Sequence, residues 1–163
     1  MTNLGLELAL ASMGVEFLRA KVGDRHVLAL LKKHGGTLGG ETSGHLLCLD
    51  RTTTGDGLVT ALQVLSVMQR TGRKLSELTS GMEQFPQVLL NVKVARPVDP
   101  HGEPSIRDAV GAAETALGKR GRVVLRASGT ERVIRVMVEG ENHQQVDSLA
   151  RQLAESVRLA LGG

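Results

Sequence analysis

A basic turn sequence, Arg126-Ala127-Ser128-Gly129-Thr130-Glu131-Arg132-Val133-Ile134-Arg135, lies between two apolar runs, residues 123–125 and 133–138. Short apolar runs separated by a glycine-containing turn predict a β-hairpin. Ser-Gly-Thr supplies two hydroxyls, backbone N–H groups and one residue that tolerates a positive φ, a combination that suits an anion. The flanking arginines add guanidinium groups, which bind phosphate through paired hydrogen bonds. The sequence therefore predicts a phosphate-binding hairpin, with a solvated turn between basic strands as the alternative.

The pattern around this hairpin, residues 87–163, predicts one α+β domain. Apolar residues alternate with polar ones from residue 87 to 94, which is typical of a strand with one buried face. An apolar stripe over 106–117 predicts a helix that Gly118 ends, and Asn142 with Gln145 has the spacing of a capping box for the last helix. The order is β-α-β-β-α, so we expect an antiparallel sheet with its helices on one face.

Residues 1–86 have a different pattern, which predicts an α/β domain. We expect a buried helix over 4–13, a strand over 15–22 and a second helix capped by Asp24, which together form a βα unit. Glycines then bracket a short strand before Glu41, and residues 45–49 form the next strand. A third helix over 57–70 is expected to bury its apolar stripe, namely Leu58, Ala61, Leu62, Leu65 and Met68. The aperiodic, proline-containing segment 81–86 separates the two domains.

Composition narrows the class of protein. The 163 residues are 41% hydrophobic and 23% charged, without an apolar run long enough to span a bilayer and without a signal-peptide pattern, so a cytoplasmic protein with no membrane contact is expected. The single cysteine, Cys48, lies in an apolar run and is expected to be a small core residue.

The charge is unevenly distributed. The net charge of +3 is too small for binding a polyanion through the bulk field, and aromatic residues make up only 1%, which argues against single-stranded nucleic-acid binding. Six basic residues gather near the hairpin in the sequence, which suits one anionic group: Lys119, Arg120, Arg122, Arg126, Arg132 and Arg135.

Three motifs resemble one family. Arg-x-Ser-Gly-Thr-Glu from Arg126, followed by Ile-Arg-Val-Met-Val-Glu, is similar to the phosphate-binding loop of the α-D-phosphohexomutases. Gly40-Glu41-Thr42-Ser43-Gly44-His45 resembles the sugar-recognition loop of that family, and Thr52-Thr53-Thr54-Gly55-Asp56-Gly57 follows it. The resemblance runs in order from Thr2 to Val157. One departure is Arg132, where the family usually has proline.

The resemblance implies roles for individual residues. The phosphate-binding group is Arg126, Ser128, Gly129, Thr130 and Arg135. Glu41 and Ser43 would hold sugar hydroxyls, Arg25 would contact sugar or phosphate, and His45 would lie near the reacting oxygens as a general acid or base. Without the resemblance, the 41–45 segment could be a polar turn, His45 the first residue of a strand, and Asp24-Arg25 a helix start.

The resemblance also implies what the chain lacks. It covers most of the third, α/β/α domain of the family, here truncated, and all of the fourth, TATA-box-binding-protein-like domain. The phosphoserine loop and the aspartates that bind Mg²⁺ belong to the missing N-terminal domains, so no metal site and no catalytic nucleophile are expected here and the chain alone should be inactive.

The implied reaction interconverts the 6-phosphate and the 1-phosphate of glucosamine through a bisphosphate intermediate, with glucosamine or glucose 1,6-bisphosphate as activator. The strand after the loop favours the amino sugar, whereas a phosphomannomutase or phosphoglucomutase activity is the alternative. A non-enzymatic nucleic-acid-binding module is the alternative from another class. The open sheet edge of the first domain could also pair with a second copy to give a homodimer.

Overall fold

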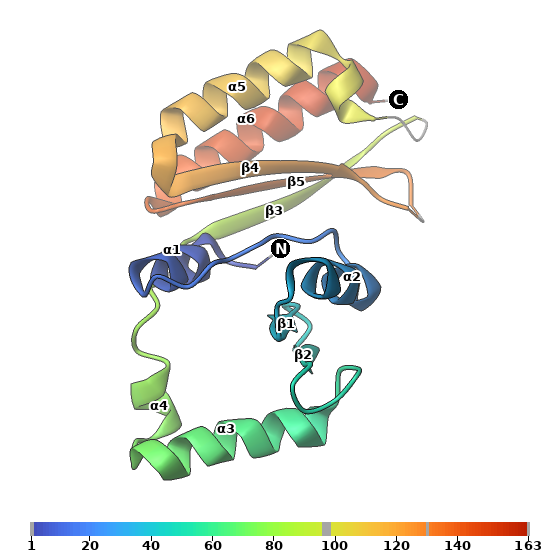
Figure 1. Cartoon of the computed structure of the whole chain (residues 1–163). Helices are drawn as coiled ribbons and strands as arrows, with labels where there is room; N and C mark the ends of the chain where they lie inside the picture. Colours follow the sequence, from blue (N-terminus) through green and yellow to red (C-terminus); the bar gives the residue numbers. More distant parts are fainter. Residues whose placement is uncertain (1, 96–98, 130, 163) are drawn as a thin grey trace. The chain divides into compact units, whose positions relative to one another are not determined.

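The computed structural model describes residues 2–95, 99–129 and 131–162, and the chain divides into two compact units, Met1–Glu83 and Gln84–Gly163 (Figure 1). The division falls within the aperiodic segment 81–86.

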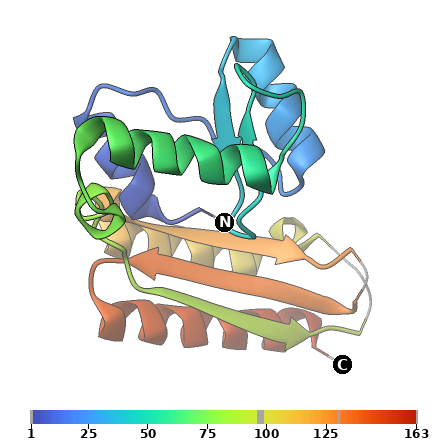
Figure 2. The same cartoon turned by 90° about the horizontal axis from the view of Figure 1, so that it is seen from below.

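Unit 2 contains one antiparallel sheet of three strands, β3 (Gln87–Lys93), β4 (Gly121–Ala127) and β5 (Val133–Gly140). The strand order is β3-β5-β4, so β5 is central and β3 and β4 form the edges (Figure 2). Helices α5 (Pro104–Leu117) and α6 (His143–Leu161) lie on the same face of the sheet (Figure 1), and two short 3₁₀ turns, η1 (Pro100–Gly102) and η2 (Gly118–Arg120), flank α5. The predicted β-α-β-β-α order with helices on one face is confirmed.

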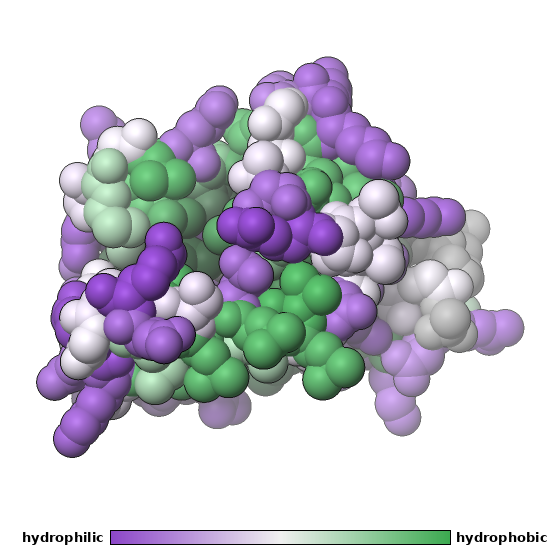
Figure 3. All heavy atoms as spheres, turned by 60° about the horizontal axis from the view of Figure 1, so that its bottom comes forward, coloured by the Kyte–Doolittle hydropathy of each residue, from purple (hydrophilic) through white to green (hydrophobic). Residues whose placement is uncertain are grey.

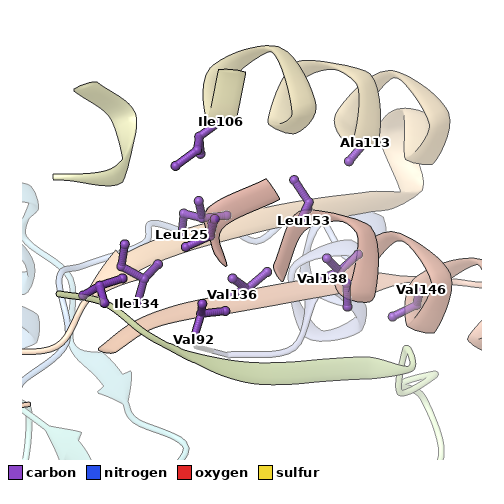
Figure 4. Packing of buried hydrophobic residues seen from close by; sticks show 12 residues of the cluster. Val92, Ile106, Ala113, Leu125, Ile134, Val136, Val138, Val146 and Leu153 are labelled. Carbon is purple, nitrogen blue, oxygen red and sulfur yellow. The ribbon is translucent and has the colours of Figure 1, made fainter. Parts of the chain in front are cut away.

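The core of unit 2 lies between this sheet and its two helices (Figure 4). Alternate residues of the strands point toward the helices, because side chains of a strand alternate between the two faces of a sheet. The Asn142 side chain accepts a hydrogen bond from the Gln145 N–H at 3.0 Å and so caps α6, as expected. The buried residues of this core are Val92, Val94, Ile106, Ala113, Leu125, Ile134, Val136, Val138, Val146, Ala150, Leu153 and Val157.

Unit 1 has four helices and one hairpin among the described residues. The helices are α1 (Leu4–Ser12), α2 (Asp24–His34), α3 (Gly57–Thr71) and α4 (Leu75–Leu78). Strands β1 (Leu38–Gly40) and β2 (Leu46–Cys48) pair antiparallel, with α2 against β1 and α3 against β2. Cys48 is buried, as predicted.

The strand expected over residues 15–22 is wrong, and with it the βα unit. Residues 15–21 adopt no regular structure, and Val15, Leu18 and Val22 are exposed. A strand needs a neighbour to satisfy its backbone hydrogen bonds, and the two-stranded sheet described in unit 1 uses only β1 and β2.

The burial expected for two helices of unit 1 is also wrong. In α1 only Leu4 and Gly5 are buried. In α3 no residue is buried, and three leucines of its apolar stripe remain exposed: Leu58 at 80%, Leu62 at 62% and Leu65 at 57%. Ala61 is exposed as well, and Met68 is half-buried. Figure 3 shows apolar residues, drawn in green, on the surface of the molecule.

Candidate anion and sugar site

The β4–β5 hairpin places Arg126 directly opposite Arg135. Residues directly opposite in an antiparallel pair project from the same face, with their Cβ atoms about 5 Å apart. The turn between them is closed by the Ser128 N–H, which donates to the Val133 carbonyl at 2.9 Å, and by the Glu131 N–H, which donates to Ser128 Oγ at 3.3 Å. The predicted β-hairpin is therefore present, and it brings the two arginines together.

The two arginines project from the face of the sheet opposite α5 and α6. Their neighbours Leu125 and Ile134 are buried in the core under α5 and α6 (Figure 4). Because side chains alternate along a strand, Arg126, Ser128 and Arg135 belong to the opposite face.

The charges of this pair are poorly compensated within unit 2. The Arg126 side chain is exposed and forms no ion pair or hydrogen bond with the described residues. Arg135 Nη2 lies 3.8 Å from the exposed Glu131 carboxylate, and its Nε is buried without a hydrogen-bond partner among the described residues. Like charges directly opposite one another destabilise a sheet, so an anion bound here would relieve the repulsion.

The tip of the turn is open. Gly129 is exposed, and a Cβ added there would meet nothing within 4 Å. The φ angle of Gly129 is not in the left-handed region, although the sequence predicted that this glycine would allow a positive φ. Thr130, which is also predicted to bind phosphate, lies outside the described residues, and the phosphate-binding roles of all five residues stay predictions.

The six basic residues expected around the hairpin turn divide between the two ends of the sheet. Arg122 lies opposite Glu139 and donates to it, and Arg120 pairs with Glu141 and stacks on Phe85. Lys119 precedes β4 at the same end. A strand rises about 3.3 Å per residue, so Arg122 lies about 13 Å from Arg126 along β4. The expectation of one basic cluster is wrong, because residues that are close in the sequence lie far apart along an extended strand.

In unit 1, residues Glu41 to His45 form the loop of the β1–β2 hairpin. The Glu41 N–H donates to the His45 carbonyl, and Gly44 has a φ of +87°, which only glycine adopts without strain. The Glu41 carboxylate accepts a hydrogen bond from the Gly23 N–H at 2.8 Å. Glu41 therefore ties the hairpin to the start of α2, and its second carboxylate oxygen remains available for a hydroxyl.

His45 lies where three segments of unit 1 meet. Its Nδ1 is 3.9 Å from an Asp24 carboxylate oxygen at the start of α2. On the other side, a Cβ added to Gly55 would lie 1.7 Å from His45 Nε2, so only glycine fits there beside the imidazole. The sequence pattern did not predict this contact between Gly55 and His45. The one hint in the sequence is a glycine at position 55 within the polar segment before α3.

Arg25 and Ser43 are both exposed beside this cluster. Arg25 lies in the first turn of α2, and its Nε approaches His26 Nε2 at 3.4 Å. The expected cap of α2 is wrong: the N-cap is Gly23, and the Asp24 carboxylate accepts from the Arg25 N–H. Asp56 caps α3 by accepting hydrogen bonds from the N–H groups of Leu58 and Val59.

The described residues contain no group of three or more His, Cys, Asp or Glu side chains that could hold a metal ion. The described residues therefore do not fit a Mg²⁺ site. None of the described helices combines the length and apolar character needed to cross a membrane.

Comparison with known proteins defines the class first. Residues 1–85 match the family model for the phosphoglucomutase/phosphomannomutase alpha/beta/alpha domain III, and residues 89–156 match the C-terminal domain of the same family. The chain belongs to the phosphoglucomutase/phosphomannomutase family, as the resemblance in the sequence implied.

Within the family, similarity to one kind of enzyme is high. The chain is 57% identical over 162 residues to a phosphoglucosamine mutase from Nitrosococcus oceani, covering 99% of this chain and 36% of that protein. A second phosphoglucosamine mutase, from Thioalkalivibrio sulfidiphilus, is 58% identical over 162 residues, with 97% of this chain and 36% of that protein covered. The chain thus spans 36% of the length of these relatives.

The fold is also that of a solved structure. An Aspergillus fumigatus N-acetylphosphoglucosamine mutase in complex with glucose 1,6-bisphosphate matches with a TM-score of 0.77 at 19% identity, covering 99% of this chain and 38% of that one. Another structure of the enzyme from this organism contains GlcNAc-6P and magnesium; it matches with a TM-score of 0.75 at 19% identity, over 95% of this chain and 39% of that one.

Proposed function

We propose that this chain supplies the sugar-binding and phosphate-binding part of a phosphoglucosamine mutase, an isomerase that interconverts glucosamine 6-phosphate and glucosamine 1-phosphate. The identity of 57% to a named phosphoglucosamine mutase supports the amino sugar over the phosphomannomutase and phosphoglucomutase alternatives. A cytoplasmic location accompanies this proposal.

The main support for this proposal is that Arg126 and Arg135 lie directly opposite each other beside Ser128. Two guanidinium groups on one face of a sheet, with one exposed carboxylate as neighbour, suit the doubly charged phosphate of a sugar. In the proposed role Arg126 and Arg135 hold the phosphate that is not reacting, and Ser128, Gly129 and Thr130 add hydroxyl and N–H donors.

The hairpin loop of unit 1 is proposed to hold the sugar ring. Glu41 has one carboxylate oxygen bound by Gly23 and one left to accept from a sugar hydroxyl, while Ser43 and Arg25 present exposed donors. His45 carries a titratable imidazole held between Asp24 and Gly55, which suits a proton donor or acceptor close to the reacting oxygens. A site that pairs each hydroxyl rejects isomers, because a wrong isomer leaves buried polar groups unpaired.

The remaining chemistry belongs to other parts of the whole enzyme. Phosphoryl transfer there would use a phosphoserine, Mg²⁺ and a bisphosphorylated sugar, consistent with the related structures that contain magnesium or glucose 1,6-bisphosphate. The residues of this chain bind and orient the sugar phosphate, and they supply no phosphoryl acceptor.

The test combines binding and turnover. In an enzyme that contains all domains, Arg126→Ala should weaken glucosamine 6-phosphate binding by about 1.5–3 kcal/mol, the range for losing hydrogen bonds between charged groups. Calorimetry that finds unchanged affinity would contradict the phosphate site. The 163-residue chain with glucose 1,6-bisphosphate and magnesium should show no mutase turnover, and activity above background would reveal a nucleophile within it.

A coupled assay of the complete enzyme with each hexose phosphate separates the amino-sugar enzyme from the other mutases. Oligonucleotide binding with a steep salt dependence would instead support the nucleic-acid-binding alternative.

A further inference from the structure

The third strand of the unit 2 sheet brings two more polar residues to the arginine pair. In the register of β3 with β5, Asn91 lies directly opposite Arg135, and Lys93 lies directly opposite Val133 at the hairpin end. Arg135 is in turn opposite Arg126 on β4. One row of the sheet therefore reads Asn91, Arg135, Arg126 across all three strands, with Lys93 diagonal to Arg135.

All four side chains belong to the face of the sheet opposite α5 and α6. Val92 and Val94, the neighbours of Lys93, are buried in the core under the helices, so the alternation of the strand assigns Asn91 and Lys93 to the opposite face (Figure 4). Directly opposed side chains are about 5 Å apart at Cβ and diagonal ones about 7–8 Å, distances that long polar side chains bridge. Asn91 and Lys93 are both exposed.

This arrangement concentrates positive charge with little compensation. Three cations, Lys93, Arg126 and Arg135, share this end of the face, and Glu131 is the acidic group paired there. Within the part of the chain that the structure describes, neither Lys93 nor Asn91 uses its side chain in a hydrogen bond or ion pair. Their donors therefore remain available to a ligand: three N–H bonds of an ammonium and two of an amide.

We propose that Lys93 and Asn91 extend the phosphate site onto β3, with the Lys93 ammonium as a third cation and the Asn91 amide as a neutral donor to the phosphate oxygens. This inference rests on the proposed function of the hairpin as a phosphate site. A sugar phosphate carries up to two negative charges and several acceptor oxygens. Two arginines alone meet one side of such a group, and donors from a third strand meet another side.

A competing explanation for Lys93 is protection of the sheet edge, because β3 is an edge strand and an exposed lysine discourages pairing with other chains. The two explanations predict different results. Edge protection predicts that removing the charge promotes aggregation and leaves the affinity for phosphate unchanged, whereas the phosphate role predicts weaker binding by a monodisperse protein.

The experiment titrates the 163-residue chain with inorganic phosphate and with glucosamine 6-phosphate at constant ionic strength, following backbone amide chemical shifts. Lys93→Met should raise the Kd about five- to twentyfold and Asn91→Ala about two- to fivefold, the range for one charge-assisted and one neutral hydrogen bond in a partly exposed site. Lys93→Arg should restore most of the affinity. The phosphate-induced rise in Tm should shrink in parallel, because binding to the folded state alone stabilises it.

Lys119→Met is the matched control. It removes the same charge from the same unit, but Lys119 precedes β4 at the far end of the sheet, more than about 20 Å away along the strands. An equal loss of affinity in Lys119→Met would reduce the effect to net charge and overturn the inference. An unchanged Kd in Lys93→Met, with Arg126→Met weakened, would overturn the inference and leave the proposed function intact. Unchanged affinity in Arg126→Met as well would contradict the phosphate site itself.

Discussion

The two units of this chain bury their apolar residues to very different degrees. Among the described residues of unit 1, the buried apolar side chains are Leu4, Leu47 and Cys48, whereas unit 2 packs a continuous core between its sheet and both helices. Helices α3 and α6 both have an apolar stripe in the sequence, and α6 is the more strongly amphipathic of the two. In α6 the apolar stripe is buried, but in α3 its leucines are exposed. An amphipathic pattern therefore shows which face of a helix is suited to burial, but not whether a neighbour is there to cover it.

Truncating one side chain in each unit should produce the largest contrast. Ile134→Ala, in the fully buried centre of unit 2, should lower the free energy of unfolding by about 2–5 kcal/mol, since it opens a cavity in a close-packed core. Leu62→Ala on α3 should change it by less than about 0.5 kcal/mol, because the side chain is already 62% exposed. Urea unfolding followed by circular dichroism measures both, and similar losses would contradict the comparison.

A second contrast lies within unit 1, around His45. Gly55→Ala places a methyl group on the imidazole and should cost about 1–3 kcal/mol through overpacking, with a shift of the His45 ring resonances. Gly57→Ala is the matched control, because a Cβ there meets nothing within 4 Å and Gly57 is the first residue of α3. The control should be neutral or slightly stabilising, since alanine favours the helix. Normal His45 resonances in Gly55→Ala would show that the contact is absent.

Substitutions of Glu41 should have smaller effects on stability, and comparing two of them distinguishes a structural role of this residue from a role in binding. Glu41→Ala removes the acceptor of the Gly23 N–H and should cost about 0.5–1.5 kcal/mol of stability. Glu41→Gln keeps an oxygen in place and should leave the Tm nearly unchanged while weakening binding of every hexose phosphate. A large drop in Tm for Glu41→Gln with normal binding would assign Glu41 a purely structural role.

The smallest effect is expected from two exposed ion pairs on α6. The hydrogen bond from Arg151 lowers the pKa of Asp147 below its usual 3.8, and the hydrogen bond from Arg158 lowers the pKa of Glu155 below its usual 4.5. Carboxylates with a lowered pKa in the folded state stabilise it above the unfolded pKa, and this contribution disappears as the pH falls through the folded pKa.

The double variant Arg151→Gln/Arg158→Gln should therefore have a slightly lower Tm than the parent at pH 7, and the difference should vanish at a pH of about 2. High salt at pH 7 should also narrow it, because salt screens exposed pairs. A difference that persists in acid would point to packing by the arginine stems instead.

Much of unit 2 could be predicted from its sequence, because its signals are local. The alternation over 87–94, the stripe of α5 and the turn between β4 and β5 each lie within one element or one hairpin. Unit 1 was less predictable. Residues 15–22 include side chains that favour strands, but no strand pairs with them. The apolar residues of α3 recur with helical spacing, but its leucines are exposed. Strand pairing and helix burial depend on neighbours that a local pattern does not include.

For the candidate site, the sequence by itself determined the hairpin and placed Arg126 and Arg135 on its two strands, because two apolar runs around a short glycine-containing turn specify a hairpin. It also determined the motif that relates the chain to its family. Only the tertiary structure decided which other charges join this pair. Arg122 is four residues from Arg126 in the sequence, yet an extended strand carries it away to Glu139. Lys93 is 33 residues before Arg126, yet the pairing of β3 with β5 brings it to the same end of the same face, because sheet registry, not distance along the chain, sets which side chains meet.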